Sequence, residues 1–389
     1  MAYSGGLDTS VSILWLKEKY SYDVVTLTVD VGQKEDLKEV EERAKAIGAL
    51  RHYSIDAKSE FASDYIFPSI KANALYEGKY PLGTALARPL IAKKLVEVAE
   101  EEGAEAVAHG CTGKGNDQVR FDVTIRALNP RLKIIAPVRE WGMDRESERR
   151  FAVERGIPIS QKKSRFSIDQ NLWSRSIEGS ELEDPFFEPP QEAFEWVKVE
   201  DLPDEATYVT LRFEGGVPIA LDGEELDPVE LIERLNSIAG ANGFGIVDHV
   251  EDRLVGIKSR EVYEAPAALS ILEAHKDLEK LVLTKHELEF KRLVDEKWSW
   301  LVYNGLWIEP LRMELDSFIN EGQKRVNGEV RLKYYKGGMR VVGRRSTESI
   351  YDRSLATYEW ASAFDQSLAK GFIELWGLQS RLGFRRVKG

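Results

Sequence analysis

The stretch SGGLDTS, residues Ser4 to Ser10, is the most informative signal for the fold of the first half of the chain. Apolar residues follow it at Val11, Leu14 and Trp15, a spacing typical of a helix. Glycines let a backbone approach a ligand closely, and the N–H groups and dipole of a helix start suit an anion. A glycine turn followed by an ordinary Ser, Thr or Asp cap would have the same composition. The stretch therefore predicts a loop before a helix, with a phosphate site and a plain turn both open.

Outward from this loop, the first 160 residues alternate between strand and helix patterns. Residues 23–29 are a β-rich run, and residues 34–47 are a charged helical stretch closed by Gly48. Further strands are expected at 52–55, 106–108 and 133–138, and further helices at 85–102, 117–128 and 144–156. Repeated β-α units predict a parallel sheet covered on both faces, with ligands beyond the carboxyl ends of its strands.

A second glycine-rich loop, AHGCTGKGND at residues 108–117, also follows a strand and precedes a helix. It is only superficially like a Walker A loop, because Lys114 is followed by Gly115 and not by a Ser or Thr that could hold magnesium. Two phosphate-compatible loops on one sheet are hard to explain as turns. Together they predict a nucleotide site.

The pattern changes after residue 160, where polar loops and prolines interrupt it. Hairpins are expected at 207–221 and 329–344, helices at 228–239 and 265–294, and a strand at 246–258. A C-terminal helix is expected over 354–375, and the aromatic residues on it and directly after it are Tyr358, Trp360, Phe364, Phe372 and Trp376. We therefore expect three parts: a nucleotide-binding domain (1–160), an α+β domain (161–353) and a C-terminal helix (354–389) that packs on a partner subunit or on its own chain.

Composition excludes several classes of protein. The net charge of −12 counts against a general nucleic-acid binder. No apolar run is long enough for a transmembrane helix, and the first residues do not read as a signal peptide, so a cytoplasmic, soluble protein is expected. A single cysteine, Cys111, and five histidines without HExxH spacing predict neither a disulfide nor a zinc site.

The stretch SGGLDTS resembles the SGGxDS/T loop of the N-type ATP pyrophosphatases, which cleave ATP between its α- and β-phosphates. Six stretches, spread in order from residue 2 to about residue 270, together resemble the argininosuccinate synthase family: AYSGGLDTS, VGQKEDLKE, YPLGTALARP, HGCTGKGNDQVRF, FSIDQNLWSRSIEG and RLVGIKSREVYEAPAA. The resemblance implies a Rossmann-like α/β domain, an α+β synthetase domain and a C-terminal oligomerisation helix. This family usually has a full apolar strand before the first loop, but only Met1, Ala2 and Tyr3 precede it here. Either the first strand is short, or the given sequence starts at a different point from the family's start.

The resemblance also implies three sets of binding residues. For ATP they are Ala2, Tyr3, Ser4, Gly5, Gly6, Leu7, Asp8, Thr9, Ser10 and Gly110. For aspartate they are Thr112, Asn116 and Asp117. For citrulline they are Tyr80, Asn116, Arg120, Ser167, Ser176, Glu251 and Tyr263, with Thr84 as a neighbour. No catalytic residue and no metal ligand is assigned.

The reaction implied by the resemblance joins citrulline to aspartate in arginine biosynthesis. The ureido oxygen attacks the α-phosphate of ATP, releasing pyrophosphate, and the aspartate amine then displaces AMP to give argininosuccinate. ATP enters as a substrate with Mg²⁺, no prosthetic group is expected, and the assembly implied is a homotetramer without nucleic acid or membrane. The residue types agree, because Arg120 suits a carboxylate and Glu251 suits an ammonium group.

Two alternatives remain open. The chain could be another N-type pyrophosphatase that adenylates a different substrate. One cysteine and the negative charge count against a tRNA-thiolating enzyme, and the lack of a glutaminase domain counts against an amidotransferase. It could also be a non-catalytic adenine-nucleotide-binding module. Each residue has a plainer interpretation as well: Arg120 as a solvated charge, Glu251 as a partner of Arg253, and Tyr263 as a core aromatic residue.

Overall fold

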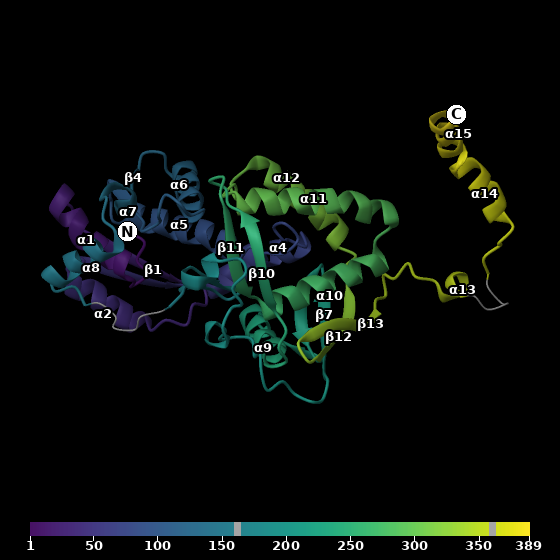
Figure 1. The fold of residues 1–389 in the computed structure, drawn as a ribbon, viewed down its shortest axis with the longest axis horizontal. Helices are drawn as coiled ribbons and strands as arrows, with labels where there is room; N and C mark the ends of the chain where they lie inside the picture. The colour runs from purple at the N-terminus through teal and green to yellow at the C-terminus, as the bar shows by residue number, and fades with distance from the viewer. Residues whose placement is uncertain (159–164, 358–362) are drawn as a thin grey trace.

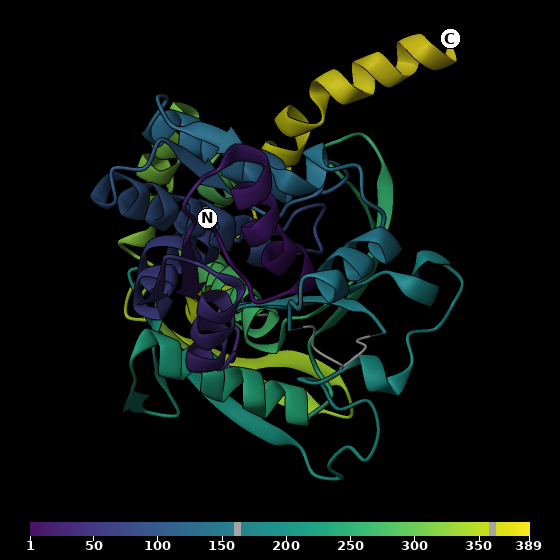
Figure 2. The same cartoon turned by 90° about the vertical axis from the view of Figure 1, so that its left-hand side faces the viewer.

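The computed structural model describes residues 1–158, 165–357 and 363–389. Figure 1 shows a body in two parts, with the first half of the chain at one end, and a C-terminal arm that lies apart from it. The view turned by 90° shows the same arm projecting away from the body (Figure 2). Among the described residues, none of the helices has both the length and the apolar character needed to cross a membrane.

The first part contains a parallel sheet in two halves. One half pairs β1 (Val25–Asp30) with β2 (Arg51–Asp56), and the other pairs β3 (Ala106–Ala108) with β4 (Lys133–Ile135). Residues 1–3 join them: Ala2 pairs with Leu27 of β1 in parallel, and its N–H donates to the Ala108 carbonyl of β3 at 2.8 Å. The parallel sheet is confirmed, and residues 1–3 lie between its two halves.

Helices cover both faces of this sheet, as the β-α pattern predicts. One face packs on α1 (Leu7–Tyr20), α2 (Leu37–Ile47) and α8 (Arg145–Glu154). The other packs on α5 (Gly83–Glu101) and α6 (Asp117–Leu128). The strand expected to run to residue 138 ends at Ile135, because Pro137 starts the short helix α7 (Pro137–Glu140) and has no N–H for a ladder bond. A further helical segment after β2 comprises α3 (Lys58–Glu60), a π-helical turn (Phe61–Ile66) and α4 (Phe67–Lys71).

The second part has two antiparallel sheets. The smaller one has the strand order β10-β11-β6-β5 and the larger one β13-β12-β7-β8-β9. Their bounds are β5 (Ser167–Gln170), β6 (Arg175–Glu178), β7 (Thr207–Glu214), β8 (Val217–Leu221), β9 (Glu224–Glu225), β10 (Ile246–Asp252), β11 (Lys258–Glu264), β12 (Gly328–Tyr335) and β13 (Gly338–Arg345). Short 3₁₀ turns lie at Ser180–Glu183 and Gln191–Ala193. Both predicted hairpins are present, and the α+β character of this part is confirmed.

Two predicted boundaries in this part are wrong for local reasons. The single strand expected at 246–258 is the hairpin of β10 and β11, which turns where Gly256 has φ +86° and donates its N–H to the Arg253 carbonyl. The helix expected at 265–294 is two helices, α10 (Pro266–Val282) and α11 (Lys285–Tyr303). Thr284 and Glu287 form a capping box that starts α11. Helices α9 (Pro228–Ala241) and α12 (Pro310–Gln323) complete this part.

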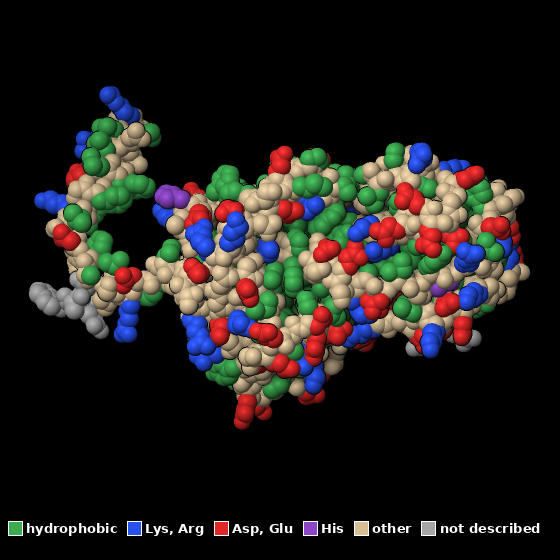
Figure 3. Space-filling view, turned by 180° about the vertical axis from the view of Figure 1, so that it is seen from behind, with side chains coloured by type: hydrophobic (Ala, Val, Ile, Leu, Met, Phe, Trp, Pro, Cys, Tyr) green, Lys and Arg blue, Asp and Glu red, His purple; other side chains and the backbone are tan. Residues whose placement is uncertain are grey.

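The C-terminal segment is helical, but in pieces. It contains α13 (Arg353–Ala356), α14 (Leu368–Trp376) and α15 (Leu378–Lys388), where one helix over 354–375 was expected. Tyr358 and Trp360 lie outside the described residues. Neither α14 nor α15 has a buried residue, and Figure 3 shows hydrophobic side chains gathered along this arm. The exposed large apolar side chains of α14 and α15 are Leu368, Phe372, Ile373, Leu375, Trp376, Leu378, Leu382, Phe384 and Val387.

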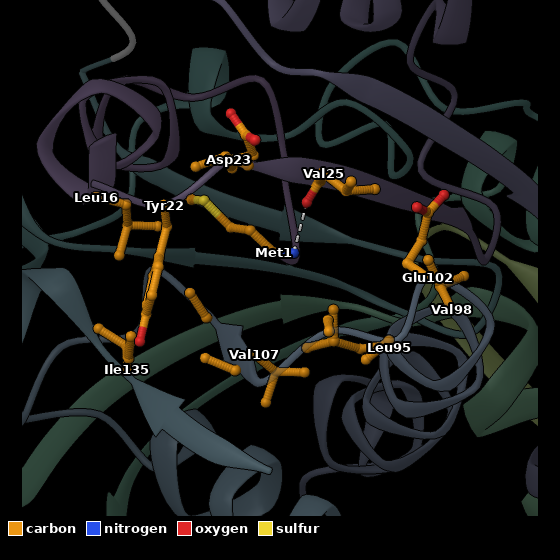
Figure 4. A pocket seen from close by; sticks show the side chains of 15 residues that line it. Met1, Leu16, Tyr22, Asp23, Val25, Leu95, Val98, Glu102, Val107 and Ile135 are labelled. Carbon is orange, nitrogen blue, oxygen red and sulfur yellow. Dashed lines mark hydrogen bonds between the residues drawn. The ribbon is translucent and has the colours of Figure 1, made fainter. Parts of the chain in front are cut away.

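An apolar cavity of about 90 Å³ lies beside Met1, between β1 and β3. Leu95, Val98 and Val107 line it, and the Met1 nitrogen donates to the Val25 carbonyl at 2.7 Å (Figure 4). Met1, Val25 and the start of β3 are at the amino ends of their strands. Ligands of parallel α/β sheets bind at the carboxyl ends, so we place the candidate site at the other edge.

The central strand gives a stability prediction. Thr28 is buried and its hydroxyl donates to the Tyr3 carbonyl at 2.6 Å. In Thr28→Val the shape is kept but this carbonyl loses its donor, which should cost about 1–3 kcal/mol. Calorimetry should show the first thermal transition at a lower temperature. Thr347→Val, at an exposed position, is the matched control, and equal midpoints for the two variants would contradict a stabilising role of the Thr28–Tyr3 hydrogen bond.

Candidate active site

The first glycine-rich loop connects the central strand to α1, as predicted. Gly5 has φ +72°, and Gly6 caps α1 without a side-chain hydrogen bond. The Thr9 hydroxyl lies 3.2 Å from the Ser4 hydroxyl and donates to the Gly6 carbonyl at 3.2 Å. The helix start is therefore left open at the carboxyl edge of the sheet, which is the arrangement that suits an anion.

The second loop lies against the first one. A Cβ on Gly110 would stand 2.8 Å from the Thr9 methyl group, so only glycine fits at this approach. His109 is buried and its Nε2 lies 2.7 Å from the Asp122 carboxylate. Burial raises the pKa of the Cys111 thiol to about 12, so the thiol stays protonated. The two loops form one surface, and neither His109 nor Cys111 is poised as a nucleophile or base there.

Charged side chains that we did not predict surround the first loop. Arg145 of α8 contacts Asp8 and lies 3.1 Å from Glu148. Burial and the neighbouring Asp8 raise the pKa of Glu148 to about 8, so this carboxyl is largely protonated at neutral pH. On the other side, Arg43 donates to the Gly5 carbonyl at 2.7 Å. Arginines thus flank the loop from two helices.

A polar cluster lies at the far end of the second loop. Glu251 of β10 is buried and accepts from the Tyr263 hydroxyl at 2.8 Å and from the Tyr303 hydroxyl at 2.6 Å. The Asn116 amide donates to the same Tyr303 hydroxyl at 2.9 Å. Arg120 is buried and donates to the Tyr303 carbonyl through Nε and Nη2. These contacts bring together Asn116, Arg120, Glu251 and Tyr263, which come from both parts of the body.

Asp117 connects this cluster to a second arginine. Its carboxylate accepts from Arg120 and from Arg88 of α5, each at 2.8 Å, and Arg88 also contacts Asp169 of β5. Burial would raise the pKa of Asp117, but the two guanidinium groups outweigh it and hold the pKa below its usual value. Asp117 is therefore a charged carboxylate at neutral pH.

The remaining candidate residues divide into two groups. Tyr80 is buried, stacks on Tyr263 with ring centroids 4.3 Å apart, and its hydroxyl lies 2.6 Å from the Thr84 hydroxyl. Ser176 of β6 is the register partner of Tyr263, so it adjoins the cluster. Ser167 and Thr112 are exposed, and within the described ranges no hydrogen bond joins their side chains to the cluster.

Arg88 and Tyr303 contact the candidate site residues but were not predicted from the sequence. Arg88 had a visible signal, because it is a lone charge in the apolar stretch of α5 from Ala85 to Ala92. The sequence signal for Tyr303 is weak, because helices that end in a sequence such as Tyr-Asn-Gly are common. Its role depends on how α11 docks, which no local pattern reports.

The comparisons with known proteins agree along the whole chain. Residues 1–158 match the model of the arginosuccinate synthase N-terminal HUP domain, and residues 166–383 match that of the arginosuccinate synthase C-terminal domain. A protein of Pyrococcus furiosus named argininosuccinate synthase is 60% identical over 100% of this chain and 95% of its own length. Proteins of the same name from Pyrobaculum aerophilum and Methanocaldococcus jannaschii are each 55% identical over 100% of this chain and 98% of their own length.

The parallel sheet with its two adjoining loops, the antiparallel second part and these full-length similarities agree with one another. The resemblance found in the sequence is confirmed. The chain belongs to the argininosuccinate synthase family.

Proposed function

We propose that this protein ligates citrulline and aspartate to argininosuccinate at the expense of ATP, in arginine biosynthesis. One observation carries the proposal: the loop of residues 109–116 reaches both the first glycine-rich loop and the polar cluster around Glu251. At Gly110 it approaches Thr9 of the first loop, and at Asn116 it enters the cluster of Glu251 and Tyr303. A nucleotide phosphate and an amino acid held at the two ends of one short loop would be close enough to react.

In this proposal, Ala2 to Ser10 and Gly110 hold ATP. The open N–H groups of the α1 start and the glycine backbones receive the phosphates. Magnesium would enter with the triphosphate as part of the substrate, and the carboxylate of Asp8 offers the oxygen chemistry that this ion prefers. The chain supplies no prosthetic group in this scheme.

The polar cluster fits the amino-acid substrates. Citrulline carries an ammonium and a carboxylate group at one end. Glu251 would accept from the ammonium, with the hydroxyl of Tyr263 beside it, and Arg120 has N–H groups beyond those bonded to Asp117 and Tyr303 for the carboxylate. Tyr80, Ser167 and Ser176 would complete the citrulline site. Thr112, Asn116 and Asp117 would hold aspartate.

The chemistry requires two displacements. The ureido oxygen of citrulline attacks the α-phosphorus, the bond to the β-phosphate oxygen breaks, and pyrophosphate leaves. The amine of aspartate then attacks the ureido carbon, loses a proton, and AMP leaves with the former ureido oxygen. The protein's part in both steps is to position the groups and to stabilise charge with N–H donors and arginines that are already in place.

Pyrophosphate release tests the proposed function. With ATP and magnesium, we expect release only when citrulline is added, and argininosuccinate only when aspartate is also present. A mass-spectrometric assay of both products follows the two steps separately.

The alternatives predict other results in the same assay. Release that ignores citrulline but responds to another acceptor would indicate an N-type pyrophosphatase with a different substrate. ATP binding without release under any of these conditions would indicate a nucleotide-binding module.

The proposed citrulline site is tested at Glu251. In Glu251→Gln the shape is kept, but a neutral amide cannot pair with an ammonium group. We expect kcat/KM for citrulline to fall about 30-fold or more, which corresponds to ~2 kcal/mol or more for an unpaired buried charge. The KM for ATP should change little. Glu205→Gln, at an exposed position, is the matched control. An equal loss of kcat/KM for citrulline in both variants would contradict the proposed role of Glu251.

We further propose that the C-terminal arm binds other copies of the chain, giving the homotetramer that the family resemblance implies. Leu368, Phe372 and Trp376 share the apolar side of α14, and each is more than half exposed. Apolar surface of this extent on a soluble chain usually marks an interaction site.

Removing the arm tests this assembly. A chain that ends at Gln366 lacks α14 and α15, and light scattering should give a smaller mass than that of the full chain. Phe372→Glu combined with Trp376→Glu should have the same effect, because two charges would then stand on the apolar side. Lys370→Glu is the charge-change control, and an unchanged mass for both test variants would rule out the arm as the contact.

A further inference from the structure

Tyr303, at the end of α11, contacts several residues of the candidate site at once. Its hydroxyl donates to Glu251 Oε1 and accepts from the Asn116 amide. Its ring stacks on Tyr76, with centroids 3.4 Å apart, and meets Tyr80 edge-on. Its carbonyl accepts from Arg120. One residue therefore contacts the groups that would hold both amino acids.

The end of α11 is built for this close approach. Gly305 has φ +74°, and a Cβ there would lie 3.1 Å from Cα of Arg120. Glycine therefore lets the chain turn directly over α6. The turn places the Tyr303 carbonyl within reach of the Arg120 guanidinium. The main chain and the side chain of Tyr303 are thus fixed by separate contacts.

We propose that Tyr303 is a positioning residue that couples the citrulline site to the aspartate site through its hydroxyl. The inference rests on the proposed function. Glu251 would face the citrulline ammonium group, and Asn116 would face both amino acids. The hydroxyl between them sets the direction of the Glu251 carboxylate and of the Asn116 amide together. Loss of this oxygen leaves the Asn116 N–H without its acceptor and one Glu251 oxygen without its donor.

Kinetics of Tyr303→Phe in the full chain test the coupling. The ring and its stacking on Tyr76 stay, so the fold should be kept. We expect KM to rise about 10- to 100-fold for citrulline, as for a lost hydrogen bond to a charged group, and several-fold for aspartate. Both kcat and the KM for ATP should stay within about twofold, because the contact is equal in the ground and transition states.

Two further variants make the result specific. Tyr263→Phe removes a donor to Glu251 that has no bond to Asn116, so it should raise KM for citrulline and leave KM for aspartate unchanged. Tyr335→Phe is the matched control, because Tyr335 is half exposed at the end of β12.

The outcomes separate this inference from the proposed function. Unchanged KM values for both amino acids in Tyr303→Phe would overturn the coupling. So would an equal rise of all three KM values with a lower melting temperature, because that is the result of a structural defect. Lack of citrulline-dependent pyrophosphate release by the unaltered chain would instead overturn the proposed function, and the coupling with it.

Discussion

The hydrogen bond from the Ala2 N–H to the Ala108 carbonyl is the constraint on which the rest of the site depends. Ala2 and Ala108 each stand just before a glycine-rich loop, so this bond starts the two loops side by side. The Tyr3 N–H, bonded to the Leu27 carbonyl, fixes the same strand on its other side. The two neighbours of this segment are held by their own pairs, β1 with β2 and β3 with β4.

The second part of the body contacts the second glycine-rich loop through Asn116. Asn116, at the start of α6, accepts from the Leu254 N–H at 2.9 Å and donates to Tyr303. The β10–β11 hairpin and helix α11 of the second part are therefore both hydrogen-bonded to this residue. Charges in this region are compensated within the protein, because Asp117 bonds both Arg88 and Arg120, and Arg88 also contacts Asp169. Groups that are already paired and oriented need little rearrangement when charge develops during a reaction.

Much of the fold and part of the site could be predicted from local patterns. Glycines and strand-helix alternation were enough for the parallel sheet and both loops, because those signals are local. The β10–β11 hairpin and the break before α11 were not predicted. Gly256 and the Thr284–Glu287 capping box are local signals for them. The hydrophobic pattern, used alone, favoured one uninterrupted strand and one uninterrupted helix. Tyr303 could not be found in this way. Its importance comes from tertiary packing, which places the end of α11 over α6 from almost two hundred residues away.

The close approach of Gly110 to Thr9 has a consequence for how this sequence can change. The space between the two loops is shared, with 2.8 Å between the Thr9 methyl group and the position of a Cβ on residue 110. A larger residue at either position takes space from the other. Substitutions at these two positions are therefore non-additive, although the positions are about a hundred residues apart in sequence. A serine at position 9, which lacks the methyl group and keeps the hydroxyl, would remove the atom that a Cβ at position 110 meets. Substitutions in one loop therefore depend on the residue present in the other.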